Sequence, residues 1–142
     1  IPSLKLFKND KTTDNLQQVF SPESTRRIAE ILDSAASDNG SGYRAVIDGY
    51  SVAGKTGTAE MVIDGKYNKD GAKRTYFIGF SPAKNPKYIM AVRLDYPKKC
   101  FVSWDPTMRN RCEGSNSAAM VFQKAMKRIL INDPEIKSKF EG

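Results

Sequence analysis

Apolar residues recur at helical spacing in two stretches, one near each end of the chain. In Ser21-Pro22-Glu23, a serine N-cap, a proline at the first helical position and an acid in the first turn predict a helix start. The glycine-rich stretch 39–42 predicts the end of this helix. Its apolar face is predicted at Ile28, Ile31, Leu32 and Ala35. A second helix is predicted over residues 115–130, with apolar surface from Ala118, Met120, Val121, Ala125, Ile129 and Leu130.

The middle of the chain is rich in β-branched and aromatic residues and predicts strands separated by turns. The Asp48-Gly49 and Asp64-Gly65 pairs predict turns, and Ser81–Pro86 predicts another. A short extended segment is predicted at residues 43–47. The predicted strands are Tyr50–Ile63, Thr75–Phe80 and Tyr88–Leu94.

The predicted order of helix, three antiparallel strands and helix indicates an α+β fold. With 142 residues and neither an internal repeat nor a linker, residues 1–142 are expected to form a single unit. The sequence contains no apolar run near the roughly 20 residues that span a bilayer, and no recognisable signal peptide. A targeting segment of an exported parent protein would therefore lie outside this sequence.

Charge and composition narrow the possible chemistry. The net charge is +7, and residues 41–99 carry 11 basic and 5 acidic side chains. This excess fits a solvated basic surface or an electropositive cleft for a carboxylate-bearing substrate. No aromatic-interleaved basic motif indicates nucleic-acid binding. The chain has no histidine, which excludes a histidine-based triad or histidine-ligated metal within it, and its two cysteines cannot by themselves form a four-thiolate zinc site.

The triplet Lys55-Thr56-Gly57 is the strongest chemical signal in the sequence. A Lys-Thr-Gly triplet is one of three short motifs of penicillin-recognising active sites with a serine nucleophile, beside S-x-x-K and S-x-N. On an edge strand lining a cleft, the Lys55 ammonium can lie near the nucleophile and the substrate carboxylate. Thr56 can donate a hydrogen bond to that carboxylate, and Gly57 allows close approach to the backbone. A glycine- and threonine-rich edge strand with a solvated lysine is the alternative interpretation.

The same residues also satisfy a phosphate-binding pattern. Residues 49–56 match G-x-x-x-x-G-K-[ST], which requires a following helix that offers its amides to phosphate. Here Gly57, Thr58 and further β-branched residues follow, which predicts a strand instead. A nucleotide-binding protein therefore remains an alternative that depends on whether residues 57–63 are helix or strand.

Two further stretches imitate the partner motifs of Lys-Thr-Gly. Ser81-Pro82-Ala83-Lys84 fits S-x-x-K, but Asn85-Pro86 follows at once and disfavours a helix there. Ser37-Asp38-Asn39 fits S-x-N, but it stands at the predicted end of a helix, where these residue types are common. Both are predicted to be turns, so the nucleophile motif is expected to be missing from this chain.

Four stretches occur in a characteristic order along the chain: Ser21-Pro22-Glu23, Gly40-Ser41-Gly42-Tyr43-Arg44-Ala45, Gly49–Ala59 and Phe77–Tyr88. With these motifs, the chain resembles the C-terminal part of the transpeptidase domain of class B penicillin-binding proteins. The resemblance spans residues 20–96, and the 115–130 helix fits the closing helix of the family. Leu94–Lys98 is similar to the cell-division (septal) type rather than the elongation type.

The resemblance implies an α+β fold of the penicillin-binding-protein and serine β-lactamase type, in which this chain supplies three antiparallel strands flanked by helices. It implies D,D-transpeptidation through a serine acyl-enzyme, with the nucleophile in an upstream portion. Lys55 would contribute positive potential and proton handling, and Thr56 would bind the carboxylate. Gly57 and Thr58 would line the substrate or β-lactam site, with the Thr58 N–H in the oxyanion hole. No cofactor or metal is implied.

The implied partners are peptidoglycan stem peptides, β-lactams and the cell-wall machinery of division or elongation. The implied location is the periplasmic face of a bacterial inner membrane, with the parent protein anchored by an upstream helix. In that oxidising compartment, a Cys100–Cys112 disulfide is plausible, whereas two free thiols are the default in cytosol. The stretch containing both cysteines is not an expected feature of the family. A penicillin-recognising sensor or inactive homologue is the remaining alternative.

Overall fold

The computed structural model describes residues 18–67, 72–98, 100 and 112–136. Its elements in chain order are the helix α1 (Pro22–Ala35), a short 3-10 helix η1 (Tyr43–Ala45), strands β1 (Ala53–Glu60), β2 (Val62–Ile63), β3 (Lys66–Tyr67), β4 (Lys73–Ser81) and β5 (Tyr88–Asp95), and the helix α2 (Ala118–Ile131). The fold is therefore α+β, as predicted. No helix in the described ranges is long and apolar enough to cross a bilayer.

The three long strands form an antiparallel sheet in the order β1-β4-β5, so β4 is central and β1 lies at an edge. The register pairs Thr56 with Phe77 and Gly57 with Tyr76. The predicted strand 50–63 is too long: β1 ends at Glu60, and β2 pairs with β3 in a separate hairpin. In the turn between β2 and β3, Asp64 and Gly65 both have positive φ angles, which is the backbone geometry expected of an Asp-Gly hairpin.

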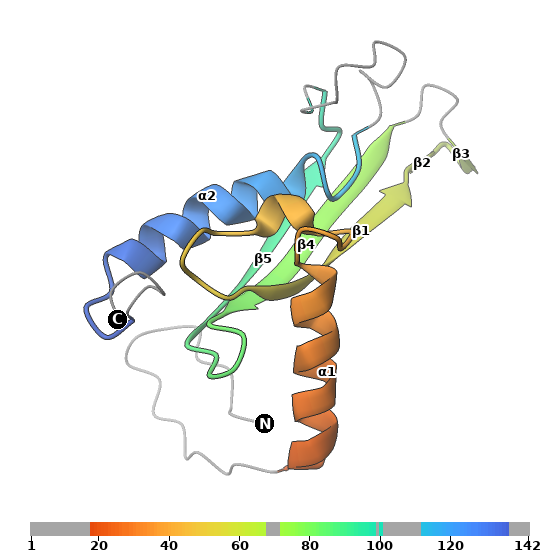
Figure 1. Ribbon diagram of the computed structural model, residues 1–142. Coiled ribbons are helices and arrows are strands. Elements are labelled where there is room, and N and C mark those ends of the chain that lie inside the picture. The colour runs from red at the N-terminus through yellow and green to blue at the C-terminus, as the bar shows by residue number, and fades with distance from the viewer. Residues whose placement is uncertain (1–17, 68–71, 99, 101–111, 137–142) are drawn as a thin grey trace, which may run out of the picture.

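The core lies on one face of this sheet. Figure 1 shows α2 running beside the sheet, whereas α1 approaches it only with its C-terminal end. Phe77 of β4 and Phe122 of α2 are fully buried, with ring centroids 4.6 Å apart. The buried residues of α2 are Ala118, Ala119, Phe122, Met126 and Leu130. The predicted apolar set is thus correct at Ala118 and Leu130 but misses the centre of the buried face, and Val121 is exposed.

The helix α1 begins as predicted but packs differently. The Ser21 side chain accepts a hydrogen bond from the Ser24 N–H, and Pro22 occupies the first turn. No residue of α1 is buried, and Ile28 and Ile31 are 52% and 66% exposed. The predicted apolar face is therefore covered only at its C-terminal end, where Leu32 and Ala35 are half-buried.

The segment after α1 turns sharply to reach β1. The predicted extended stretch at 43–47 is wrong, because Tyr43–Ala45 forms η1 with hydrogen bonds from Ala45 N to Gly42 O and from Val46 N to Tyr43 O. Ala45 is completely buried in the hydrophobic core. Gly40 is needed at the start of this turn, because a Cβ there would stand 2.2 Å from the Ala35 carbonyl oxygen. The turn therefore carries residues 40–42 back over the sheet.

Candidate active site

The free edge of β1 exposes backbone groups at alternate residues. In an antiparallel ladder, hydrogen-bonded and free pairs alternate along the strand. The Met61 N–H donates to the Ala72 carbonyl at 2.9 Å, so odd-numbered residues at this end point their backbone groups toward β4. Thr56 and Thr58 consequently present their N–H and C=O groups at the other edge, which pairs with no described strand.

Lys55 places its ammonium at this edge. Its Nζ donates to the carbonyl oxygen and the hydroxyl of Thr56, each at 3.3 Å. The contact to the Thr56 carbonyl agrees with the alternation inferred from Met61. Lys55 is exposed and Thr56 is half-buried, so both are placed to meet a ligand. The predicted edge-strand lysine is thus found with the neighbouring threonine hydroxyl beside it.

Ser41 is a further polar residue at this place, to which the sequence analysis assigned no role. Its hydroxyl lies 3.3 Å from Lys55 Nζ and 3.4 Å from the Thr56 hydroxyl. The turn after α1 delivers it there, since the Gly42 N–H donates to the Ala35 carbonyl at 2.8 Å. Its position between two glycines, in a stretch that carried the family resemblance, was the available signal. Ser41, Lys55 and Thr56 together form a cationic, hydroxyl-lined edge that suits a carboxylate.

Gly57 and Thr58 lie directly beneath another segment of the chain. The Gly114 N–H donates to the Thr58 hydroxyl at 3.0 Å. A Cβ on Gly114 would stand 2.7 Å from the carbonyl oxygens of both Gly57 and Tyr76, so the backbones are in close contact. The atoms nearest to a Cβ on Gly57 would belong to the Tyr76 side chain, at 3.4 Å, which is ordinary van der Waals contact. No local sequence signal indicated the Gly114 contact, because 56 residues separate the partners.

The two imitation motifs are turns, as predicted. Ser81 ends β4 and is completely buried, and its hydroxyl donates to the Ser51 carbonyl at 2.8 Å. Bends follow through Lys84 in place of the helix that S-x-x-K chemistry requires. Ser37 lies in the turn after α1, where its hydroxyl donates to the Ser34 carbonyl. Neither stretch contributes to the edge formed by Ser41, Lys55 and Thr56.

The nucleotide-binding alternative is wrong, because it required a helix at residues 57–63. A phosphate-binding loop needs a helix immediately after Lys55-Thr56, whose N-terminal amides would hold the phosphate. Residues 53–60 instead form the continuous strand β1, and residues 62–63 form β2.

Cys100 and Cys112 are joined as a disulfide in the structure, with their Cα atoms 5.4 Å apart. Cys112 is 4% exposed. The bond ties the stretch after β5 to the stretch before α2, two residues from Gly114. In the described part of the chain, no group of three or more His, Cys, Asp or Glu side chains is placed to hold a metal ion.

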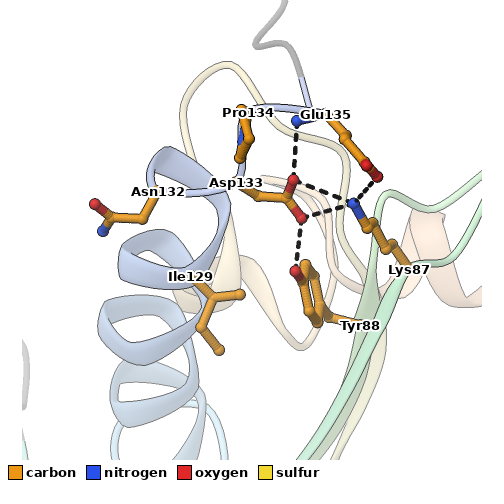
Figure 2. A pocket seen from close by; sticks show the side chains of 7 residues that line it. All are labelled: Lys87, Tyr88, Ile129, Asn132, Asp133, Pro134 and Glu135. Atoms are coloured by element: carbon orange, nitrogen blue, oxygen red, sulfur yellow. Dashed lines mark hydrogen bonds and ion pairs between the residues drawn. The ribbon is translucent and has the colours of Figure 1, made fainter.

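A hollow of about 290 Å³ lies at the C-terminal end of α2 and is lined by an internal ionic network (Figure 2). Lys87 bridges Asp133 and Glu135, and the Tyr88 hydroxyl donates to Asp133 at 2.6 Å. These hydrogen bonds from Tyr88 and Lys87 lower the pKa of Asp133 to about 2. The charged side chains of this network are paired with one another. They hold the end of α2 against β5 and are not free to bind or react with a ligand.

Asp95 at the end of β5 is likewise held by its neighbours. Arg93 and Arg74 both donate to its carboxylate, and these hydrogen bonds hold the pKa of Asp95 well below its usual range. A carboxylate that remains ionised in this way is unsuited to general acid–base catalysis near neutral pH. The edge of β1 therefore remains the best candidate site.

The sequence model of the penicillin binding protein transpeptidase domain matches residues 3–127. The chain belongs to this family. The Lys-Thr-Gly edge and the surrounding order of elements are thus parts of a transpeptidase domain. The predicted family and the predicted fold are both confirmed.

Curated relatives show the same kinship. Peptidoglycan D,D-transpeptidase FtsI of Buchnera aphidicola subsp. Baizongia pistaciae is 33% identical over 129 residues, which cover 88% of this chain and 20% of the relative. Stage V sporulation protein D of Bacillus subtilis is 43% identical over 82 residues, covering 58% of this chain and 12% of the relative. The transpeptidase segment thus spans about a fifth or less of the length of these relatives.

Solved structures of penicillin-binding proteins share the fold. The transpeptidase domain of Burkholderia pseudomallei penicillin-binding protein 3 superposes with a TM-score of 0.63 at 29% identity, over 89% of this chain and 37% of that one. Penicillin-binding protein 3 of Mycobacterium tuberculosis, complexed with ampicillin, gives a TM-score of 0.59 at 25% identity, over 89% and 30%.

Proposed function

We propose that this chain supplies the Lys-Thr-Gly strand of a serine-type peptidoglycan D,D-transpeptidase, as the C-terminal portion of its transpeptidase domain. The serine nucleophile and the S-x-N motif would come from parts of the protein outside this sequence. Family membership supports the proposal, as does the name of the Buchnera relative, a peptidoglycan D,D-transpeptidase.

The observation that carries the proposal is the free edge of β1. The Lys55 ammonium, the hydroxyls of Thr56 and Ser41, and the Thr58 N–H all belong to that edge or lie within hydrogen-bond range of it. Acyl transfer needs a group to hold the carboxylate of the substrate, a cation near the reacting centre, and a backbone donor for the oxyanion. This edge supplies donors of all three kinds.

The roles follow from the donors. Thr56 and Ser41 donate hydroxyl hydrogen bonds to the terminal carboxylate of a D-Ala-D-Ala stem peptide, and Lys55 supplies the positive charge beside it. When the serine attacks the penultimate D-Ala carbonyl, its oxygen becomes negative, and the outward N–H of Thr58 stabilises that charge. D-Ala leaves, and an amine from a neighbouring stem resolves the acyl-enzyme. A β-lactam would enter by the same route and acylate the serine.

The partners and location proposed for the parent protein follow from this chemistry. Peptidoglycan lies outside the cytoplasmic membrane, so the domain would act on the periplasmic face, anchored in the inner membrane by an upstream helix. A Cys100–Cys112 disulfide is compatible with that oxidising compartment. The FtsI name of one relative supports partners from the cell-division machinery rather than the elongation machinery.

The deciding experiment uses the full-length protein that contains this chain. It is incubated with a fluorescent penicillin and analysed by intact mass and peptide mapping, and D-Ala release from a pentapeptide substrate is measured in parallel. One adduct per molecule, on a serine outside residues 1–142, together with D-Ala release, is expected. An adduct on a serine of this chain would refute the proposal. Acylation without D-Ala release would assign the protein as a penicillin-recognising sensor.

A second arm uses residues 1–142 alone. Because S-x-x-K occurs here only in the Ser81–Lys84 turn, with Ser81 buried, we expect no covalent adduct. A stoichiometric adduct on this fragment would contradict the assignment of the nucleophile to another part of the protein.

A further inference from the structure

The short segment 112–117 lies across β1 and β4 beside the Lys-Thr-Gly strand. The Gly114 backbone touches the backbones of Gly57 and Tyr76, as the 2.7 Å approach of a Cβ there shows. Its N–H also donates to the Thr58 hydroxyl at 3.0 Å. Thr58 thus has its side chain held by this segment while its own N–H faces the free edge of β1.

Both ends of the segment are held by bonds to other parts of the chain. At the C-terminal end, the buried Ser117 hydroxyl contacts the Thr75 hydroxyl at 2.9 Å and donates to the Glu113 carbonyl. Thr75 pairs with Thr58 in the sheet, so this anchor lies in the same row. At the N-terminal end, Cys112 is bonded to Cys100, which follows β5. The disulfide is therefore a covalent link between this segment and the part of the chain that follows β5.

From this arrangement we propose that the Cys100–Cys112 disulfide positions the oxyanion-hole strand, by holding Gly114 against Gly57 and Thr58. Neither cysteine touches the substrate. They act through Gly114, which fixes the position of the Gly57-Thr58 backbone and hence the direction of the Thr58 N–H bond. The inference rests on the proposed function, because it assigns a task to the disulfide within that same site.

This arrangement predicts a specific kinetic signature. Acylation by a β-lactam has a reversible binding step with constant K and a covalent step with rate constant k2. An oxyanion donor acts on the charge that develops only in the covalent step, so displacing it lowers k2 and leaves K nearly unchanged. Small displacements at an active site can cost up to about a hundredfold in rate, and we expect k2 to fall by between about fivefold and a hundredfold.

The test measures k2 and K in the full-length protein, oxidised and reduced in situ. A dithiol reductant transfers two electrons and two protons, which leaves Cys100 and Cys112 as thiols while the reductant closes its own disulfide. We expect k2 to fall on reduction, K to change by less than twofold, and k2 to recover on reoxidation. The number of acylated sites per molecule is counted in each state, so that loss of folded protein is distinguished from a slower step.

Two variants complete the test. In Cys100→Ser/Cys112→Ser, k2 should match that of the reduced protein, and the reductant should have no effect. Gly114→Ala should lower k2 in the oxidised protein. It should lower k2 little further in the double cysteine variant, because substitutions that disrupt the same set of contacts do not have additive effects. A k2 within twofold of the oxidised value after verified reduction would overturn the proposal. Absence of acylation in the oxidised protein would instead contradict the proposed function.

Discussion

The most direct test of the proposed site is Lys55→Ala in the full-length protein. Lys55 is exposed at the edge of β1, and its three hydrogen bonds are all long, at 3.3 Å. Exposed substitutions away from special features usually change stability by less than about 0.5 kcal/mol. We therefore expect the melting temperature to change little, even though the charge at the site changes.

The kinetic effect should be far larger. A cation about 4 Å from a carboxylate or an oxyanion interacts with it by roughly 4 kcal/mol at an effective dielectric constant of 20. Since each 1.4 kcal/mol corresponds to a tenfold change in rate, about a hundredfold to a thousandfold loss of the second-order acylation rate is expected. Lys55→Arg should also be impaired, because a guanidinium is bulkier and does not release a proton. Thr56→Val should be milder, because one hydroxyl hydrogen bond is lost.

The assay is the acylation rate with a chromogenic or fluorescent β-lactam, paired with thermal unfolding. Lys127→Ala is the matched control, because it removes the same charge from an exposed position on α2 rather than on β1. Normal acylation by Lys55→Ala at an unchanged melting temperature would refute the reasoning and leave the triplet as a structural strand. A large drop in melting temperature would show instead that Lys55 is structural.

Three further predictions concern the framework of the site. Gly40→Ala should destabilise the protein by about 1–3 kcal/mol or more, because its Cβ would stand 2.2 Å from the Ala35 carbonyl oxygen. Gly57→Ala is the control and should leave the stability nearly unchanged. Equal unfolding midpoints for the two variants would contradict this prediction. Phe77→Ala should cost about 3–5 kcal/mol in urea unfolding, because it empties the centre of the core, and a loss below about 1 kcal/mol would rule out the packing with Phe122. The lowered pKa of Asp133 stabilises the folded state at pH values above the ordinary carboxyl pKa, near 4, and this contribution is lost as the pH falls toward about 2. The difference in stability between wild type and Asp133→Asn should therefore shrink between pH 5 and pH 2. A constant difference in unfolding midpoints over that interval would contradict this prediction.

The sequence by itself determined those features of this protein that depend on neighbouring residues, and these were predicted correctly. The start of α1 was predictable because a capping serine and a first-turn proline act within a few residues of each other. The Asp64-Gly65 hairpin was predictable because few residues adopt positive φ angles. The order of the three strands along the chain, and the family, were also accessible from turn residues and short motifs that occur in a fixed order.

Only the tertiary structure decided which faces are buried and which distant groups meet. Helical spacing identified apolar positions on α1, but Ile28 and Ile31 remain exposed because burial depends on what another segment places opposite them. The pairing of β1 with β4 decides that the backbone groups of Thr56 and Thr58 face the free edge, which no pattern within β1 can reveal. Gly114 meets Thr58 across 56 residues of sequence, because close backbone approach depends on where two segments cross in space. The motif was therefore legible in the sequence, whereas the positioning of its groups is a property of long-range packing.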